Sequence, residues 1–272
     1  MILALKGKDK LFGVASLIFF FVGLSSAKAE LRAKEGSPFE EGIPILLYHR
    51  LGPVVADRMT VTTNVFELQL KYIIDHGYIA IPLRQLTNYH VGKTQALSYR
   101  SVVITADDGH RSVYTDMFPL LKKYRIPATL FLYPSAISNA SYAMTWDEIK
   151  EMKRSGLVDF QSHTFWHPNF WKEKERLKAV EYEHFMEMQF SKSKERLEKE
   201  LGAEVDMLAW PFGIYDDQLI GKAVEAGYVA ALTMERNRAN GSGRLMALPR
   251  YLISNEDREK AFGRILTGSP CS

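Results

Sequence analysis

The chain of 272 residues has one cysteine, Cys271, which lies one residue from the C-terminus. A disulfide within the chain is therefore excluded, and the fold must depend on packing. We interpret Cys271 as a free thiol near the end of the chain; an intermolecular bridge is the alternative. No internal repeat and no low-complexity stretch is evident. The composition is that of one globular domain with a sizeable core.

A long apolar run of transmembrane length is also lacking. Lys6, Lys8 and Lys10 precede an apolar stretch over residues 11–24, and Ala27-Lys28-Ala29 follows it. This order is typical of a secretory signal peptide. An uncleaved anchor is the alternative, but about 14 apolar residues are fewer than the roughly 20 that span a bilayer as a helix. We predict a signal peptide over residues 1–29, a domain over residues 30–272, and a secreted or periplasmic location.

The expected mature protein has no excess of positive or negative residues. The full chain has 35 Lys and Arg and 32 Asp and Glu, a net charge of +3. Residues 1–29 contain four lysines and one aspartate, which leaves 31 residues of each sign. A neutral surface gives no electrostatic reason to expect nucleic acid as a partner. A neutral polymer is a more suitable substrate.

Short apolar runs alternate with amphipathic segments along the rest of the chain. This alternation predicts an α/β fold with a mostly parallel sheet, either closed as a barrel or open and doubly wound. Gly77, Gly156 and Gly227 stand where helices are expected to end. The predicted strands are 43–48, 101–106, 128–133, 157–161, 207–210, 228–233 and 248–253. The predicted helices are 64–75, 112–124, 145–154, 172–201 and 217–226, and Thr145 to Glu148 forms a capping box.

Polar side chains follow three of these predicted strands. His49 comes after the first, Asp107 and Asp108 after the second, and His163 after the fourth. In either α/β architecture, ligands bind at the carboxyl ends of the strands. Adjacent residues of a regular strand point to opposite faces, so both aspartates can serve one site only if the strand ends there. Gly109 is suited to provide that ending.

Two neighbouring carboxylates and the pair His163 and His167 suffice for metal-assisted hydrolysis. A divalent ion held by three protein ligands, with one position open, lowers the pKa of a bound water to about 7 and polarises a carbonyl. A plain structural interpretation remains for each residue: an aspartate capping the next helix, and histidines hydrogen-bonded in the fold. The combination of both motifs favours the metal site.

These motifs resemble those of the polysaccharide deacetylase family, also known as the NodB homology or carbohydrate esterase family 4 fold. Its first motif is Thr-Phe-Asp-Asp-Gly and its second is close to His-Ser/Thr-x-x-x-His-Pro. The chain has Thr105-Ala-Asp-Asp-Gly109 and His163-Thr-Phe-Trp-His167-Pro168. Residues 207–215, Met-Leu-Ala-Trp-Pro-Phe-Gly-Ile-Tyr, resemble the third motif. The resemblance extends from Ile43 to about Leu252.

The resemblance implies a distorted (β/α) barrel with about seven parallel strands. It also implies that Asp108, His163 and His167 bind one divalent metal ion, zinc in the first instance, with Co²⁺, Ni²⁺ or Fe²⁺ as alternatives. Asp107 would be the general base that takes a proton from the attacking water. The division is physically reasonable, because a carboxylate on the cation stays an anion and leaves its neighbour free to accept a proton.

Two departures from the family pattern concern catalysis. Ala209 stands where the third motif usually has an arginine that orients the base, and we expect Arg250 to substitute for it; a surface cation is the alternative. The late Leu-x-His motif is missing, since no histidine follows His184. His49 resembles the histidine that poly-β-1,6-N-acetylglucosamine deacetylases carry on the N-terminal side, and it has the pKa range of a proton donor.

The candidate substrate-binding residues are aromatic or belong to the third motif. We expect Trp166 in a sugar groove, Trp210 and Tyr215 around an acetyl pocket with Pro211, and Phe212 packed beneath that pocket. The predicted function is deacetylation of a β-linked N-acetylglucosamine polymer. Peptidoglycan, chitooligosaccharide or O-acetyl sugar deacetylation remains an alternative, as does a silent carbohydrate-binding protein of this fold. Association with the cell envelope is open, and the sequence does not specify the oligomeric state.

Overall fold

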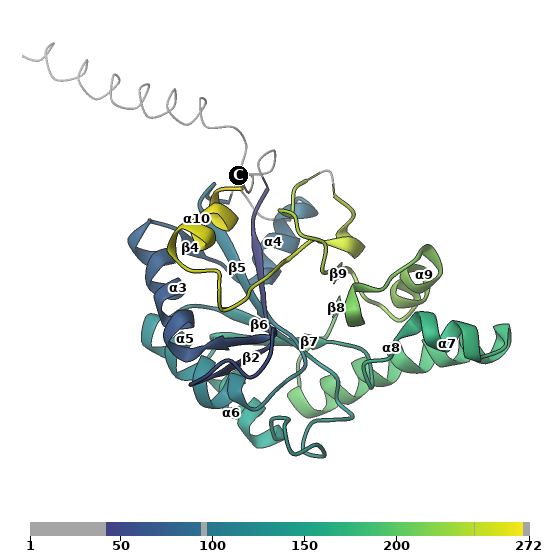
Figure 1. The fold of residues 1–272 in the computed structure, drawn as a ribbon. Helices are drawn as coiled ribbons and strands as arrows, with labels where there is room; N and C mark the ends of the chain where they lie inside the picture. Colours follow the sequence, from purple (N-terminus) through teal and green to yellow (C-terminus); the bar gives the residue numbers. More distant parts are fainter. Residues whose placement is uncertain (1–41, 94–96, 242, 269–272) are drawn as a thin grey trace, which may run out of the picture. The chain divides into compact units, whose positions relative to one another are not determined.

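The computed structural model describes residues 42–93, 97–241 and 243–268, all of which lie within one compact unit. Its main sheet contains every strand that the sequence predicts (Figure 1). These strands are β1 (Ile45–Tyr48), β5 (Ser101–Ala106), β6 (Ala128–Leu132), β7 (Val158–Ser162), β8 (Met207–Ala209), β9 (Ala230–Leu232) and β10 (Tyr251–Leu252). The short strands β2 (Arg50–Gly52), β3 (Thr60–Thr62) and β4 (Ile79–Ala80) were not expected.

The strands are parallel and lie in the order β10-β1-β5-β6-β7-β8-β9, with β4 added on β5. The sheet curls into a distorted (β/α) barrel of seven main strands, as the sequence predicts. Near the gap between the two end strands, a parallel bridge joins Leu232 to Leu248. The carboxyl ends of the strands therefore converge on one mouth.

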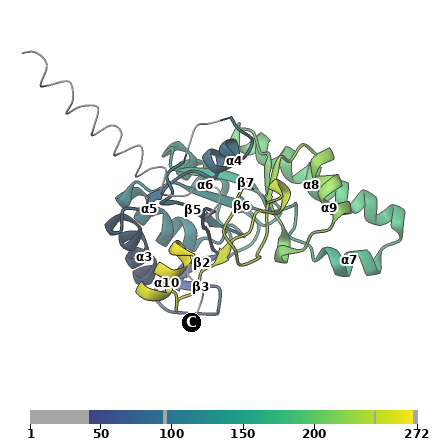
Figure 2. The same ribbon diagram turned by 90° about the horizontal axis from the view of Figure 1, so that it is seen from above.

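Helices cover the outside of the sheet. In Figures 1 and 2, α3 (Thr63–Asp75) and α5 (Phe118–Tyr124) lie on one side of the strands, and α8 (Ala179–Leu201) and α9 (Asp217–Glu225) lie on the other. The Thr145 capping box is present at α6, and Gly77, Gly156 and Gly227 all have positive φ after their helices, as predicted. The helices are α3 (Thr63–Asp75), α4 (Leu83–His90), α5 (Phe118–Tyr124), α6 (Trp146–Arg154), α7 (Phe170–Arg176), α8 (Ala179–Leu201), α9 (Asp217–Glu225) and α10 (Glu259–Thr267).

Three helical predictions differ from the structure. The helix predicted over residues 172–201 is two helices, because Leu177 has extended backbone angles (φ −97°, ψ 149°) that end α7. The helix predicted from Ser112 starts with a π-helical segment, Val113–Met117, before α5. The short helices α4 and α10 were missed. Each has only about two turns, and the apolar periodicity of so short a segment is a weak signal.

Residues of the strands alternate between two apolar clusters. Val103, Phe131 and Met207 belong to the smaller cluster, inside the barrel. Their neighbours Ile104, Leu132 and Leu208 belong to the larger cluster, which contains the buried residues of the covering helices. Since side chains alternate along a strand, this pattern identifies which residue at each strand end faces the mouth.

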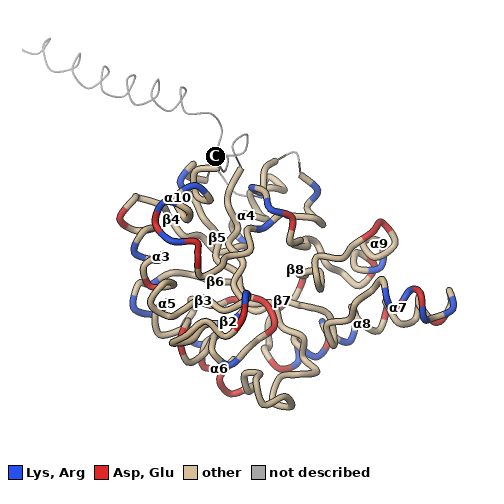
Figure 3. The backbone as a smooth tube through the Cα atoms, in the orientation of Figure 1, with Lys and Arg blue, Asp and Glu red and all other residues tan. Residues whose placement is uncertain are grey.

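Charged residues of both signs are mixed over the helices and loops (Figure 3). Within the described ranges, no helix has both the length and the apolar character of a membrane span. The predicted signal peptide, its cleavage site before Glu30, and Cys271 lie outside the described residues and remain predictions.

Candidate active site

Three candidate site residues continue the inward-facing positions of three strands. Inside the barrel, Ile45, Val103 and Gln161 occupy such positions on β1, β5 and β7. Steps of two residues along each strand then lead to His49, Asp107 and His163 at the mouth. All three side chains are at least 94% buried. The strand pairing β1-β5-β6-β7 places them on neighbouring parts of one rim.

Asp107 and Asp108 both reach the site because β5 ends before them. Asp108 has a left-handed backbone (φ 72°), and so does Gly109 (φ 70°). The turn rotates the Asp108 side chain away from the face that strict alternation would give it. A Cβ at position 109 would lie 2.9 Å from the Leu132 Cδ2 atom, which would have to shift, and the positive φ itself favours glycine. The prediction that the strand ends at this point is therefore confirmed, since β5 ends at Ala106.

Asp108, His163 and His167 form the one group of three or more possible metal ligands found in the described part of the chain. Their ligand atoms all lie within 4.8 Å of one another. The Asp108 Oδ1 atom is 3.7 Å from the Nε2 atom of His163 and 3.7 Å from that of His167. Two imidazoles and one carboxylate at these separations match the donor set of a catalytic zinc site.

Both imidazoles are in the form that binds a cation. Burial lowers the pKa of His163 to about 3 and also lowers that of His167, so both rings are neutral at neutral pH. The Nδ1 atom of His163 lies 2.7 Å from the Ala209 carbonyl oxygen. An Nδ1–H donated to that oxygen leaves Nε2 with a free lone pair toward Asp108. Such a backbone partner fixes the orientation of a metal-binding histidine.

Arg250 and Asp107 form a buried ion pair across the barrel. The two terminal nitrogens of Arg250 donate to Asp107 Oδ1 at 2.8 Å and Oδ2 at 2.7 Å. Its Nε atom donates to the Thr233 carbonyl oxygen at 2.9 Å, and the residue is 0% exposed. The predicted alternative, a surface cation, is therefore wrong. The bidentate contact holds the Asp107 carboxylate in one orientation.

The two aspartates have opposite electrostatic environments. Burial acts to raise the pKa of Asp107, but Arg250 and His163 outweigh it and lower this pKa to about 2. Burial and the nearby Asp107 raise the pKa of Asp108 to about 6. Without a cation, Asp108 is thus a poorly stabilised anion. A divalent cation between Asp108 and the two histidines would remove that penalty, so the residues present fit a bound metal.

His49 lies beside this pair, at the end of β1. The Asp107 N–H donates to the carbonyl oxygen of Tyr48 at 3.0 Å, which ties the two strand ends together. Burial lowers the pKa of His49 to about 4, while the charge of Asp107 acts to raise it. The His49 Nδ1 atom is buried and has no hydrogen-bond partner among the described residues. One hydrogen-bonding position of the imidazole is therefore unused in the structure.

Helix α8 supports the loop that carries His167. Thr164 and His167 both have left-handed backbones, with φ of 66° and 60°. The Gln189 Oε1 atom accepts from the N–H groups of Phe165 and Trp166 at 3.1 Å each, and the Ser193 Oγ atom donates to the Thr164 carbonyl at 3.0 Å. These hydrogen bonds stabilise a loop conformation that costs on the order of 1–3 kcal/mol per strained residue.

The predicted substrate-binding residues divide between surface and core. Trp166 is 45% exposed and Phe212 is 56% exposed, with its ring 4.6 Å from that of His167. The expectation that Phe212 packs beneath the pocket is therefore wrong. Tyr215 is half-buried and donates to Glu235 at 2.7 Å.

Trp210 is 0% exposed, and its indole N–H donates to the Met246 carbonyl oxygen. Its neighbour Pro211 is also buried. Trp210 takes the outward position after Ala209 and packs in the larger cluster under the helices, so it offers no ring to a sugar. Strand alternation in the sequence could have predicted this placement, because Met207 and Ala209 occupy the inward positions.

Several functional features had weak signals in the sequence. The Ala209 carbonyl and the supporting residues Gln189 and Ser193 had no motif that could reveal them. Tyr133 could have been found, because it continues the inward positions of Thr129 and Phe131.

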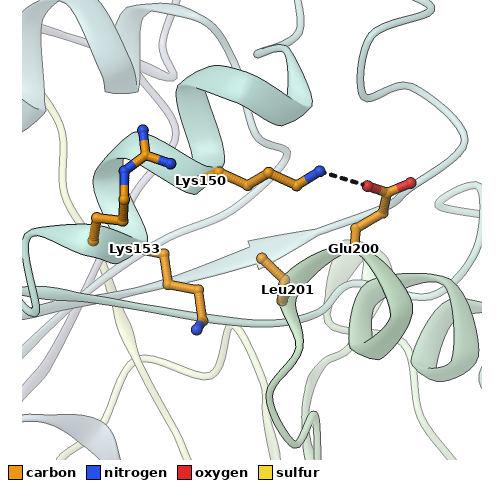
Figure 4. A pocket seen from close by; sticks show the side chains of 5 residues that line it. Lys150, Lys153, Glu200 and Leu201 are labelled. Carbon is orange, nitrogen blue, oxygen red and sulfur yellow. Dashed lines mark hydrogen bonds and ion pairs between the residues drawn. The ribbon is translucent and has the colours of Figure 1, made fainter.

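A separate hollow lies between α6 and the end of α8, where Lys150 forms an ion pair with Glu200 at 2.9 Å (Figure 4). None of the metal-site residues lines it.

Comparisons with known proteins agree with this barrel. The family model described as "Polysaccharide deacetylase" matches residues 94–231. The poly-beta-1,6-N-acetyl-D-glucosamine N-deacetylase of Escherichia coli (strain K12) is 26% identical over 82% of the chain, and that of Staphylococcus aureus (strain MRSA252) is 27% identical over 75%. The solved Streptococcus pyogenes deacetylase PplD superimposes with a TM-score of 0.74, at 24% identity, over 83% of this chain and 98% of its own.

The chain is a curled parallel barrel with a cluster of two histidines and one aspartate at its mouth. It belongs to the polysaccharide deacetylase family. The chain spans 38% of the length of the Escherichia coli relative and 71% of the Staphylococcus aureus relative. The resemblance read from the three motifs is thereby confirmed.

Proposed function

We propose that this protein is a metal-dependent N-deacetylase of β-linked N-acetylglucosamine polymers. The observation that carries the proposal is the joint placement of a three-ligand cluster and a separate, buried aspartate held by Arg250. A hydrolase of this kind needs a Lewis acid and a base side by side, and the strand ends supply both. The relatives named as poly-beta-1,6-N-acetyl-D-glucosamine N-deacetylases favour an exopolysaccharide substrate.

Asp108, His163 and His167 would hold the ion, with Zn²⁺ the first candidate because of the two nitrogen donors. When bound, a divalent ion would polarise the acetyl carbonyl and make a water molecule more acidic. Asp107 would accept the proton of the attacking water. Its low pKa, about 2, keeps it ionised at neutral pH. Arg250 would keep the carboxylate oriented and is in this sense a positioning residue.

The leaving amine needs a proton, and His49 would deliver it. The water oxygen bonds to the acetyl carbon, the carbon–nitrogen bond breaks, and the nitrogen takes the proton, which yields acetate and a free amine. His49 is neutral before the reaction because burial lowers its pKa to about 4. It must therefore gain its proton during turnover, and the proton that Asp107 takes from the water would supply it. Once Asp107 is again a carboxylate, its charge would stabilise the imidazolium, which acts to raise the pKa of His49.

The location of the reaction follows from the N-terminal sequence. The signal-peptide pattern over residues 1–29 supports export, so the polymer would be met in the periplasm or outside the cell. N-terminal sequencing of exported protein is expected to find Glu30 first. A start well before Glu30 would contradict cleavage at this site.

Acetate release tests the proposal. The exported protein is incubated with β-1,6-linked and β-1,4-linked N-acetylglucosamine oligomers, peptidoglycan fragments and an O-acetylated xylan, before and after chelation and with Zn²⁺ restored. We expect release from the β-1,6 oligomer, loss on chelation and recovery with Zn²⁺. Release only from another glycan would change the substrate, and no release from any glycan would overturn the function.

Two variants separate the proposed roles within that experiment. Asp107→Asn should abolish acetate release while the protein still binds one Zn²⁺ per chain. His49→Ala should lower kcat by about 10²-fold or more, the usual contribution of a positioned acid. An Asp107→Asn protein with activity, or a His49→Ala protein with unchanged kcat, would contradict the assigned role.

A further inference from the structure

Tyr133 occupies the inward position at the end of β6, between the strands that carry the aspartates and His163. The two preceding inward residues of β6 are Thr129 and Phe131, and Phe131 lies inside the barrel under the Arg250 guanidinium, 5.6 Å away. The same alternation gives His49, Asp107 and His163 on β1, β5 and β7. Tyr133 is the member of this rim to which the chemistry above assigns no role.

The ring of Tyr133 lies against the metal ligands. Its centroid is 5.4 Å from that of the His167 ring and 6.5 Å from that of the His163 ring. Its hydroxyl lies 2.6 Å from the hydroxyl of Tyr142. Tyr142 is 46% exposed, so the hydroxyl pair lies at the open side of the site.

The backbone next to Tyr142 is tied to the loop that carries Asp108. The Arg111 N–H donates to the Tyr142 carbonyl at 2.7 Å, and the Met144 N–H donates to the Gly109 carbonyl at 2.9 Å. The Tyr142 ring lies nearly parallel to that of His110, with centroids 6.2 Å apart. The hydroxyl pair therefore has a fixed position relative to Asp108.

A pair of hydroxyls has two protons and uses one of them internally. Within the described residues, the structure shows no further hydrogen bond from either oxygen. One O–H donor and several lone pairs remain for a ligand at the mouth. Sugar hydroxyls and acetamido groups are neutral donors and acceptors that match such a pair, and a pyranose ring can pack on the exposed tyrosine face.

We propose that the Tyr133 hydroxyl, held by Tyr142, hydrogen-bonds the N-acetylated sugar of the polymer and positions it over the metal site. This inference rests on the proposed function, because it assumes a glycan at this mouth. Tyr133 takes no part in the proton transfers. It contributes to the choice of a glycan over a small acetylated compound, since only the glycan carries the hydroxyl and amide groups that the pair recognises.

Tyr133→Phe and Tyr142→Phe test this role, with Tyr124→Phe as the matched control. The hydroxyl of Tyr124 donates to Glu67 on α3 and does not belong to the rim. Each protein is assayed for acetate release from a β-1,6-linked N-acetylglucosamine tetramer and from 4-nitrophenyl acetate. We expect Tyr133→Phe to lower kcat/KM for the tetramer about 3- to 10-fold, mainly through KM, as the loss of one neutral hydrogen bond implies. Hydrolysis of the aryl ester and the Zn²⁺ affinity should stay unchanged.

The double variant provides a second criterion. Because the two hydroxyls act as a unit, Tyr133→Phe combined with Tyr142→Phe should lose no more than about the larger single loss. Unchanged kinetics of Tyr133→Phe on the tetramer would overturn the inference. An equal loss on both substrates, or the same loss in Tyr124→Phe, would also overturn it by indicating a structural role.

Failure of the proposed function would be visible separately, as absence of acetate release from the tetramer by the wild-type protein. Calorimetric titration of the Zn²⁺-loaded protein with the same tetramer then decides the inference. Weaker binding by Tyr133→Phe than by the wild type and by Tyr124→Phe would support it. Equal binding by all three, or no binding by the wild type, would overturn it.

Discussion

Arg250 connects three strands through one side chain. Its guanidinium donates to Asp107 after β5 and to the Thr233 carbonyl after β9, and the residue itself precedes β10. The guanidinium thus lies where the sheet is open, near the Leu232–Leu248 bridge. The same contacts that orient the proposed base also hold the open side of the barrel together.

Replacing Arg250 with leucine should therefore affect stability as well as activity. The Asp107 carboxylate would remain buried without a partner, and breaking a buried ion pair in this way costs about 3–5 kcal/mol. We expect that loss in the free energy of unfolding measured by urea denaturation. Adding Asp107→Asn to Arg250→Leu should restore part of it. Stability equal to the wild type in the single variant would contradict the importance of the pair.

The pKa values of the ligands predict how metal affinity depends on pH. Asp108 has a pKa of about 6 and His163 one of about 3, so Asp108 takes up a proton before His163 as the pH falls. The protonated carboxyl does not bind the ion, and below pH 6 the apparent Kd for Zn²⁺ should rise about tenfold per pH unit. Calorimetry between pH 7.5 and 5 measures this. A flat Kd over that range would contradict the assignment of Asp108 as a ligand.

At the scale of the elements, α8 is the support of the second motif. Gln189 and Ser193 lie one turn apart on the buried face of α8 and bind the loop from Thr164 to Trp166. The loop alone is not a favourable conformation, since Thr164 is a β-branched residue at positive φ. The geometry of His167 therefore depends on a helix that contributes no ligand.

Ser193→Ala is expected to weaken Zn²⁺ binding by about tenfold, at the lower end of the effect of outer-shell partners. The Thr164 carbonyl would lose its donor, and the loop would move away from the strained conformation that presents His167. Ser191→Ala is the matched control, because Ser191 is exposed on the same helix. The Zn²⁺ affinities are measured by competition with a chromogenic chelator. Equal affinities of the two variants would contradict the proposal that α8 supports the His167 loop.

At the scale of the whole molecule, metal binding and folding are expected to be linked. The three proposed ligands come from the loops after β5 and β7, and they gather only in the folded chain. Zn²⁺ at one hundred times its Kd should then stabilise the fold by about 2.7 kcal/mol. For a domain of this size that corresponds to a rise in Tm of about 5–10 °C.

Differential scanning fluorimetry with and without Zn²⁺ measures this shift. The His167→Gln variant is the control, because it should fold but lose most of the shift. A Tm of the wild type that is insensitive to Zn²⁺ would contradict the proposed site. A shift of the same size in His167→Gln would place the ion elsewhere.

The sequence alone predicted the barrel strands and the three residues that gather as a possible metal site. The apolar runs of the seven main strands are read locally, and Asp108, His163 and His167 stand in motifs whose spacing is itself the signal. Each of these features depends on residues close together in the chain. The alternation of side chains along a strand also predicts that Trp210 is buried outside the barrel and that Tyr133 points inward. The three motifs do not indicate either placement.

Only the tertiary structure decided which distant residues complete the site. Arg250 reaches Asp107 across 143 positions, and the Ala209 carbonyl reaches His163 across 46. The position of Arg250 in the sequence favoured a partnership with the base but left a surface cation as an alternative. Such contacts depend on how the curled sheet brings strand ends together, and the carbonyl of Ala209 is a backbone group that any residue would supply. The sequence therefore fixes the local chemistry, whereas closure of the barrel decides which groups orient it.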